Sequence, residues 1–253
     1  MKRKELLFRG FLTFLFMMSI IVLSKIKLHP IFGTTGRFSL LTMFGPIIPY
    51  FVGSSFGALA IFGARILQIL VGISGAKDIF SYIIYTPIFI AGFHFAKMFR
   101  KTRKQALIPG IGIVLFLAHP IGRQVWYYSL FWTIPIAITL LKPYIRKLLK
   151  THDVPTIYLY ALSATFVDHA VGSVLFLYYL NIPAVYWNLS IPYVPIERLI
   201  YALGILIFYL FTKTALESLQ KTLPVKLVIV EATISPEKSL EEPIKASTER
   251  TDN

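Results

Sequence analysis

Charged side chains inside long apolar runs are the residues of this sequence best suited to binding or chemistry. Arg65 lies within one such run, Asp168 and His169 lie in the middle of another, and Glu197-Arg198 opens the last one. An ionisable group at membrane depth is costly and is usually paired or functional. We predict that Arg65 and Asp168 reach comparable depths, as an ion pair joining two helices or as ligands of a polar solute. Arg65 extending to a membrane interface is a third reading.

The residues next to these charges have a structural and a functional interpretation each. His169 fits a core histidine as well as a ligand, and Glu197-Arg198 is expected as an exposed pair at a helix start, where a carboxylate favours the helix dipole. Trp187 and Asn188 fall in a predicted outer loop. Trp187 could cover a cavity and stack on a ring-shaped solute, or it could belong to an interfacial aromatic belt.

Motifs for catalysis are missing from the sequence. It contains no HExxH, no Gly-x-Ser-x-Gly and no Walker-type phosphate loop, and it has no cysteine. We therefore expect a protein that is not an enzyme, with no metal site and no cofactor, and any ATP-driven process would need ATPases on other subunits. The alternative is an intramembrane enzyme or a membrane assembly protein that uses Asp168-His169.

The elements that position these residues are predicted to be membrane helices. The chain has 253 residues, of which 56% are hydrophobic and only 15% are charged, whereas soluble domains carry about 25% charged residues. Its apolar runs approach the length that spans a bilayer and cover residues 7–24, 38–52, 57–72, 79–96, 106–117, 125–141, 157–180 and 195–211. We predict an all-α, polytopic membrane helix bundle with about 6–8 transmembrane helices, in the cell membrane.

Basic clusters set the predicted orientation. Lys and Arg gather at the N-terminus and in segments 97–104 and 142–150, and short basic loops stay on the cytoplasmic side. Both termini are then cytoplasmic. Residues 1–212 hold 20 basic against 5 acidic residues, an excess that indicates a membrane partner rather than nucleic acid. Residues 213–253 are expected to form a charged, mostly disordered cytoplasmic tail.

Small residues and prolines between Gly33 and Leu70 predict close helix contacts. Gly53, Gly57 and Gly63 are assigned to helix packing, because small residues let helix backbones approach in lipid. Prolines in the same stretch remove backbone donors, which is tolerated where neighbouring protein satisfies the freed groups. This seam is also predicted to border a solute cavity.

The run FGPIIPYFVGSSFGALAIFGAR resembles the Gly- and Pro-rich region of S components of energy-coupling factor (ECF) transporters. The segments SATFVDHAVGSVLFLYYLNIP and VPIERLIYALGILIFYLF are similar to the last two helices of that family. The resemblance implies a substrate-binding subunit that captures a vitamin-like or other small polar solute and docks on a transmembrane coupling subunit with two ATPase subunits. The family has about six spans, whereas up to eight are counted here.

Together these observations predict a solute site near the outer face of the membrane, formed by the loop that holds His29 and by the buried charges. The residues assigned to substrate binding are Arg37, Arg65, Asp168, His169, Trp187 and Asn188.

Overall fold

A computed structural model describes residues 3–75 and 78–222 of the chain. Helices make up most of this part, with one two-stranded sheet. The elements are α1 (Arg3–Leu23), β1 (Lys27–Pro30), β2 (Arg37–Ser39), α2 (Leu41–Phe44), η1 (Gly45–Ile47), α3 (Ile48–Val52), α4 (Ser54–Leu70), α5 (Ile79–Ile83), α6 (Thr86–Met98), η2 (Lys104–Ala106), α7 (Leu107–Ala118), α8 (Pro120–Gln124), η3 (Trp126–Trp132), α9 (Thr133–Leu148), α10 (Val154–Leu180), α11 (Ala184–Ser190) and α12 (Tyr193–Thr222), where η marks a 3₁₀ helix.

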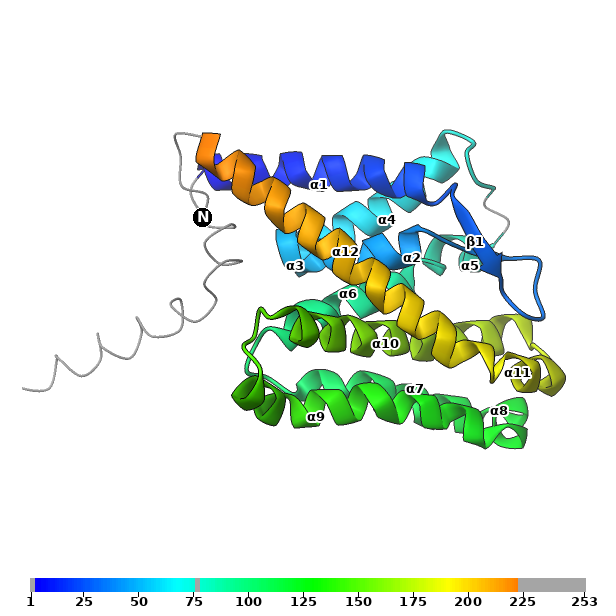
Figure 1. The fold of residues 1–253 in the computed structure, drawn as a ribbon. Helices are drawn as coiled ribbons and strands as arrows, with labels where there is room; N and C mark the ends of the chain where they lie inside the picture. The colour runs from blue at the N-terminus through cyan, green and yellow to red at the C-terminus, as the bar shows by residue number, and fades with distance from the viewer. Residues whose placement is uncertain (1–2, 76–77, 223–253) are drawn as a thin grey trace, which may run out of the picture.

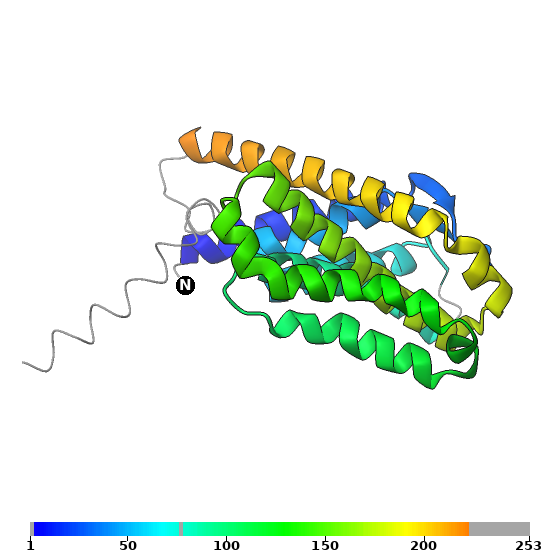
Figure 2. The same ribbon diagram turned by 60° about the horizontal axis from the view of Figure 1, so that its bottom comes forward.

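Helices α1, α7, α9 and α10 run in roughly the same direction, and α12 runs obliquely to them (Figures 1 and 2). Helix α10 is central, because it packs against α6, α7, α9 and α12, while α1 packs on α4. In the most apolar 18-residue stretch of α10, 61% of the residues are buried inside the protein. The corresponding fraction is 22–33% in α1, α5–α6 and α12. The outer helices therefore turn apolar side chains away from the protein.

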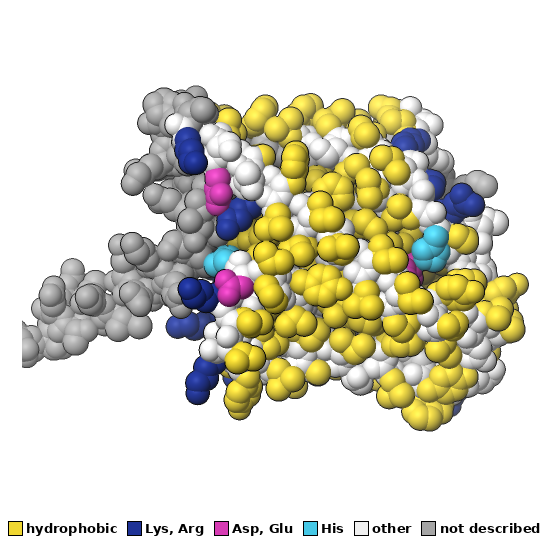
Figure 3. All heavy atoms as spheres, viewed as in Figure 1, with side chains coloured by type: hydrophobic (Ala, Val, Ile, Leu, Met, Phe, Trp, Pro, Cys, Tyr) yellow, Lys and Arg dark blue, Asp and Glu magenta, His cyan; other side chains and the backbone are white. Residues whose placement is uncertain are grey.

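Within residues 3–75 and 78–222, four helical segments are long and apolar enough to cross a membrane: Glu5–Leu23, Ile79–Met98, Val154–Leu180 and Tyr193–Leu219. Three shorter apolar helical segments, Leu41–Val52, Ser54–Leu70 and Lys104–Ala118, accompany them. Figure 3 shows hydrophobic side chains over the middle of the molecule and Lys and Arg towards its ends. This distribution is that of a multi-pass membrane protein.

The second predicted span is a broken segment rather than one helix. It divides into α2, η1 and α3, nearly all of it buried. Pro46 and Pro49 lack the backbone N–H that an unbroken α-helix needs, and burial among other helices allows the interruption. Gly53 ends the segment with a φ of 88°, a conformation that favours glycine.

Residues 25–37, expected as a loop in an all-α fold, contribute to a short antiparallel hairpin of β1 and β2. At its tip, Gly33 has a φ of 75°, and a Cβ there would lie 2.8 Å from Ile182 Cγ2. The tip therefore docks on the segment between α10 and α11. Residues 181–194 were also expected to be a loop, and they contain the helix α11.

The basic segments 97–104 and 142–150 meet at one end of the molecule, called here the basic end. The predicted sixth span begins as η3 and continues as α9 to Leu148, so Lys142 belongs to a helix and is only 1% exposed. Its Nζ donates hydrogen bonds to the carbonyls of Arg100 (2.7 Å) and Thr102 (2.6 Å). The expectation that Lys142 lies in a loop was wrong, because it belongs to α9 and these carbonyls solvate its ammonium group.

The N-terminal end of α1 and the C-terminal end of α12 also lie at the basic end (Figure 1). Helix α12 continues to Thr222, ten residues past the boundary at 212 predicted for the membrane domain. Residues 223–253, most of the predicted tail, lie outside the described residues. The opposite end carries β1, β2, α5, α8 and α11 and is called the hairpin end.

Candidate functional site

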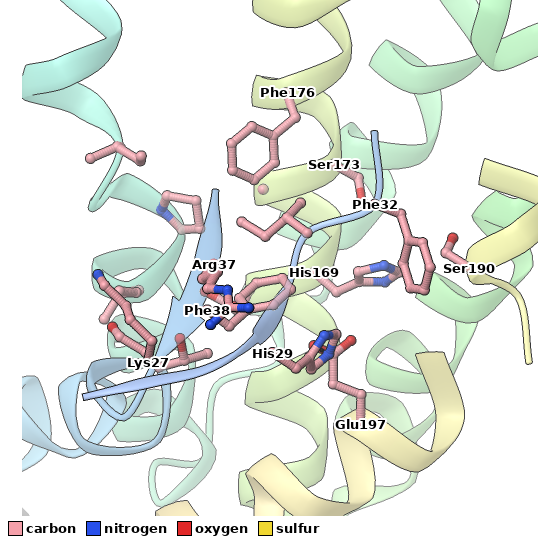
Figure 4. A pocket seen from close by; sticks show the side chains of 18 of the residues that line it. Lys27, His29, Phe32, Arg37, Phe38, His169, Ser173, Phe176, Ser190 and Glu197 are labelled. Atoms are coloured by element: carbon pink, nitrogen blue, oxygen red, sulfur yellow. Dashed lines mark ion pairs between the residues drawn. The ribbon is translucent and has the colours of Figure 1, made fainter. Parts of the chain in front are cut away.

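A cavity of about 490 Å³ lies at the hairpin end. Its walls come from the end of α1, the hairpin, the end of α4, the start of α6, the second half of α10, α11 and the start of α12. Figure 4 shows side chains from the hairpin, α10, α11 and α12 around this space. Its charged lining comprises Lys25, Lys27, Arg37, Arg65, Arg198, Asp168 and Glu197. Five cationic side chains thus face two carboxylates.

Arg198 is the centre of a buried charge cluster. It is fully buried, and its guanidinium lies 3.3 Å from Asp168 Oδ2 and 3.1 Å from Glu197 Oε2. Its Nη1 also donates a hydrogen bond to the Thr165 carbonyl of α10. On the other side, His29 Nε2 of the hairpin lies 2.5 Å from Glu197 Oε1. The expectation of an exposed Glu197-Arg198 pair was wrong, because the start of α12 packs against α10.

Asp168 therefore pairs with Arg198, and no ion pair joins it to Arg65 in the described chain. Arg65 donates through Nε to the Ser81 carbonyl, and its guanidinium lies 5.6 Å from the ring centre of Tyr85. The sequence held a signal for the true partner, because Arg198, like Arg65, is an arginine next to apolar residues of a predicted span. Choosing between two such arginines requires knowing which helices touch.

His169 lines the cavity, but hydrogen bonds occupy both of its ring nitrogens. Trp132 Nε1 donates to Nδ1 (3.2 Å), which leaves the proton of a neutral ring on Nε2, 2.9 Å from the Tyr128 hydroxyl. Tyr128 in turn lies 3.1 Å from Ser190 Oγ, which reaches the Trp187 carbonyl. These bonds assign the tautomer of His169 and connect η3, α10 and α11.

The side chains of Trp187 and Asn188, neighbours in α11, have different surroundings. Trp187 lines the cavity with 6% exposure, and its indole N–H donates to the Ile182 carbonyl. It packs edge-on against Phe116 and Tyr128 as part of the core rather than as a free lid. Asn188 does not line the cavity, since its side-chain oxygen accepts a hydrogen bond from Tyr127 at the surface.

Arg37 and two lysines bring further positive charge to the hairpin side of the cavity. Lys25 Nζ donates to the Ile73 carbonyl and Lys27 Nζ donates to the Ser24 carbonyl. Partial burial, and then the nearby charge of Lys25, lower the pKa of Lys27 below its ordinary value. Neutral carbonyls do not balance charge, so this side of the cavity remains cationic.

The three glycines assigned to packing lie away from the charges. A Cβ on Gly57 would lie 3.0 Å from Pro49, so α4 approaches the broken segment closely there. Gly63 faces Met17 of α1, and Gly53 begins α4 near Arg9. The contacts place these glycines at the junctions of α4 with its neighbours.

Several lining residues were not assigned to the site from the sequence. Glu197 and Arg198 were expected as an exposed pair at a helix start, and Tyr85 and Phe176 were not discussed. Among residues 3–75 and 78–222, no group of three or more His, Asp or Glu is arranged to hold a metal ion. The site is therefore described by cations, two carboxylates and aromatic rings.

The resemblance to ECF S components rests only on residues 44–65 and on the last two long helices. Comparison with models of known protein families, with curated proteins and with solved structures finds no match to this chain. The fold and hydropathy describe a helical protein with four candidate membrane spans.

Proposed function

We propose that the chain is the membrane-embedded, substrate-binding subunit of an uptake transporter for a small polar solute. The observation that supports this is the 490 Å³ cavity, which lies at one end of the helices and is lined by charged side chains from the hairpin, α4, α10 and α12 and from the segment after α1. Small-molecule sites are concave, mostly apolar and fitted with a few converging polar groups. The cavity has that composition.

A binding role, rather than catalysis, is proposed because the residues best suited to chemistry are engaged in structure. Both ring nitrogens of His169 have hydrogen-bond partners, and Asp168 lies against Arg198. A general base needs a free acceptor within reach of its substrate. Because neither ring nitrogen of His169 is free, we favour binding over the alternative of catalysis by Asp168-His169.

The orientation follows from the basic end. Short segments rich in Lys and Arg remain on the cytoplasmic side, which would turn the cavity at the hairpin end outward. The basic end would then face the coupling subunit and the two ATPases that the resemblance to S components implies. Uptake from outside requires this arrangement.

The test is to close the cavity by substitution. Ser173 lines it and is 5% exposed, so Ser173→Phe should fill part of the space and exclude the solute. Ala118→Phe adds the same ring at an exposed position outside the cavity and serves as the control. We expect mass spectrometry to detect a small solute in the purified wild type and the control, and to find it lost from Ser173→Phe. Equal solute content in both variants, or none in the wild type, would contradict the proposal.

A further inference from the structure

The charges that line the cavity are not balanced. Arg198 has two carboxylate neighbours, Asp168 and Glu197, and the latter also contacts His29. Of the remaining cations, Lys25, Lys27, Arg37 and Arg65, none has a carboxylate within 4.0 Å in the parts of the chain the structure describes. Both carboxylates thus lie against Arg198, and the four other cations have no counter-charge among the described residues.

Arg65 is the decisive member of this set because it is 8% exposed. Its Nε is bound by the Ser81 carbonyl, and its guanidinium faces the ring of Tyr85. Tyr85 is itself fixed, since its hydroxyl donates to Gln68 Oε1 (2.9 Å) while Gln68 Nε2 donates to Ser24 Oγ (2.8 Å). The guanidinium is therefore held in place before any solute arrives.

The two terminal nitrogens of Arg65 have no hydrogen-bond partner among the described residues, and the side chain lines the cavity. A charged side chain inside a bilayer is costly unless it is paired or solvated. The other buried cations have partners for their charged groups, since Arg198 contacts carboxylates and the ammonium group of Lys142 contacts several carbonyls. An anionic group between the two terminal nitrogens would supply the missing charge and hydrogen-bond acceptors.

We propose that the solute is an organic anion whose carboxylate or phosphate group binds the terminal nitrogens of Arg65, with Lys27 and Arg37 adding charge from the hairpin; this rests on the proposed binding function. Guanidinium matches the planar pair of oxygens of either group. Phe38 and Phe176 line the cavity beside these cations (Figure 4) and offer aromatic surface to the rest of the solute.

The experiment measures binding of four small probes of similar size to the full chain in detergent: benzoate, phenyl phosphate, benzyl alcohol and benzylamine. Benzoate and phenyl phosphate distinguish the two kinds of anion, and the other two are neutral and cationic controls. We expect one or both anions to bind at least tenfold more tightly than benzyl alcohol, and benzylamine not to bind. Benzylamine or benzyl alcohol binding as tightly as the anions, or no anion binding at all, would overturn the inference.

The variants assign the effect to Arg65. Arg65→Gln should weaken anion binding at least tenfold and leave benzyl alcohol unaffected, whereas Arg65→Lys should retain part of the affinity because it keeps the charge. Arg37→Gln should weaken anion binding less than Arg65→Gln. Because Arg37 is exposed on the hairpin, this substitution should not disturb the folding of the interior. Arg123→Gln is the matched control, an exposed arginine of α8 at the same end but outside the cavity. Unchanged anion affinity in both Arg65→Gln and Arg37→Gln would contradict the assignment.

The two proposals fail in different ways. If the purified protein holds a solute that Ser173→Phe expels, and that solute is neutral or cationic, the binding function stands and the anionic class is wrong. If it holds none, and Ser173→Phe changes nothing, the binding function itself is wrong.

Discussion

Two arginines inside apolar runs have opposite surroundings. Arg198 is buried against two carboxylates and the Thr165 carbonyl, whereas Arg65 has one carbonyl and an aromatic ring. Arg198 connects α12 to α10 through its carboxylate partner Asp168, whereas the terminal nitrogens of Arg65 have no partner among the described residues. The same residue type thus has a structural role on α12 and a proposed binding role on α4.

Removing the buried cation should destabilise the protein more than removing one of its partners. Arg198→Met leaves Asp168 and Glu197 buried without a counter-charge, and breaking a buried pair in this way costs about 3–5 kcal/mol. Asp168→Asn leaves the contact between Arg198 and Glu197 in place. We expect the larger fall in Tm, measured in detergent, for Arg198→Met. A Tm equal to that of the wild type would show that the cluster is not needed for stability.

At the scale of elements, close contacts between helices depend on prolines as much as on glycines. Helix α6 approaches the broken segment η1–α3 so closely that a Cβ on Gly92 would lie 2.8 Å from the ring of Pro49 and 3.0 Å from the Pro46 carbonyl. Neither a proline ring nor a backbone carbonyl can move aside as a flexible side chain can. Gly92 therefore fixes the separation of α6 from this segment.

Gly92→Ala should accordingly lower stability by roughly 1–3 kcal/mol, the usual effect of overpacking. Gly110→Ala is the matched control, because Gly110 lies in α7 with nothing within 4 Å of its would-be Cβ, and alanine stabilises a helix interior by about 0.5–1 kcal/mol relative to glycine. Thermal unfolding in detergent should show Tm falling for the first variant and unchanged or rising for the second. A similar Tm for both would mean that α6 can shift without loss.

At the scale of the whole molecule, the two ends differ: one carries the basic segments and the other carries the cavity. The basic end holds segments 97–104 and 142–150 with the ends of α1 and α12, while the hairpin end holds the cavity. Cationic loops tend to stay in the cytoplasm. In the proposed orientation, the cavity faces outward and the basic end faces the cytoplasm.

The chain has no cysteine, so a single introduced thiol reports its own side of the membrane. Thr35→Cys lies at the tip of the hairpin, and Lys101→Cys lies at the basic end; both positions are exposed. In intact cells we expect a membrane-impermeant maleimide to label the first and not the second, and to label both after permeabilisation. The reverse pattern would place the cavity on the cytoplasmic side and contradict uptake from outside.

The positions of the long helices could be predicted from the sequence, because the length of an apolar run and the place of a basic cluster are local properties of the chain. The long helices α1, α10 and α12 overlap the predicted runs, and segments 97–104 and 142–150 lie at one end as the loop charges indicated. The hairpin, α11 and the division at Pro46 and Pro49 were not predicted. Their formation depends on neighbours, such as the contact of Gly33 with Ile182.

The sequence by itself determined a membrane helix protein and named Arg65, Asp168 and His169 as charges and rings that need a partner. Hydropathy and ionisable side chains carry that information without reference to distant residues. Only the tertiary structure decided the partners. Asp168 forms an ion pair with Arg198, His169 accepts a hydrogen bond from Trp132, and Arg65 lines a cavity. The reason is physical, since a charge is balanced by whatever lies within a few ångströms, and the packing of α10 against α12 is not encoded by spacing along the chain.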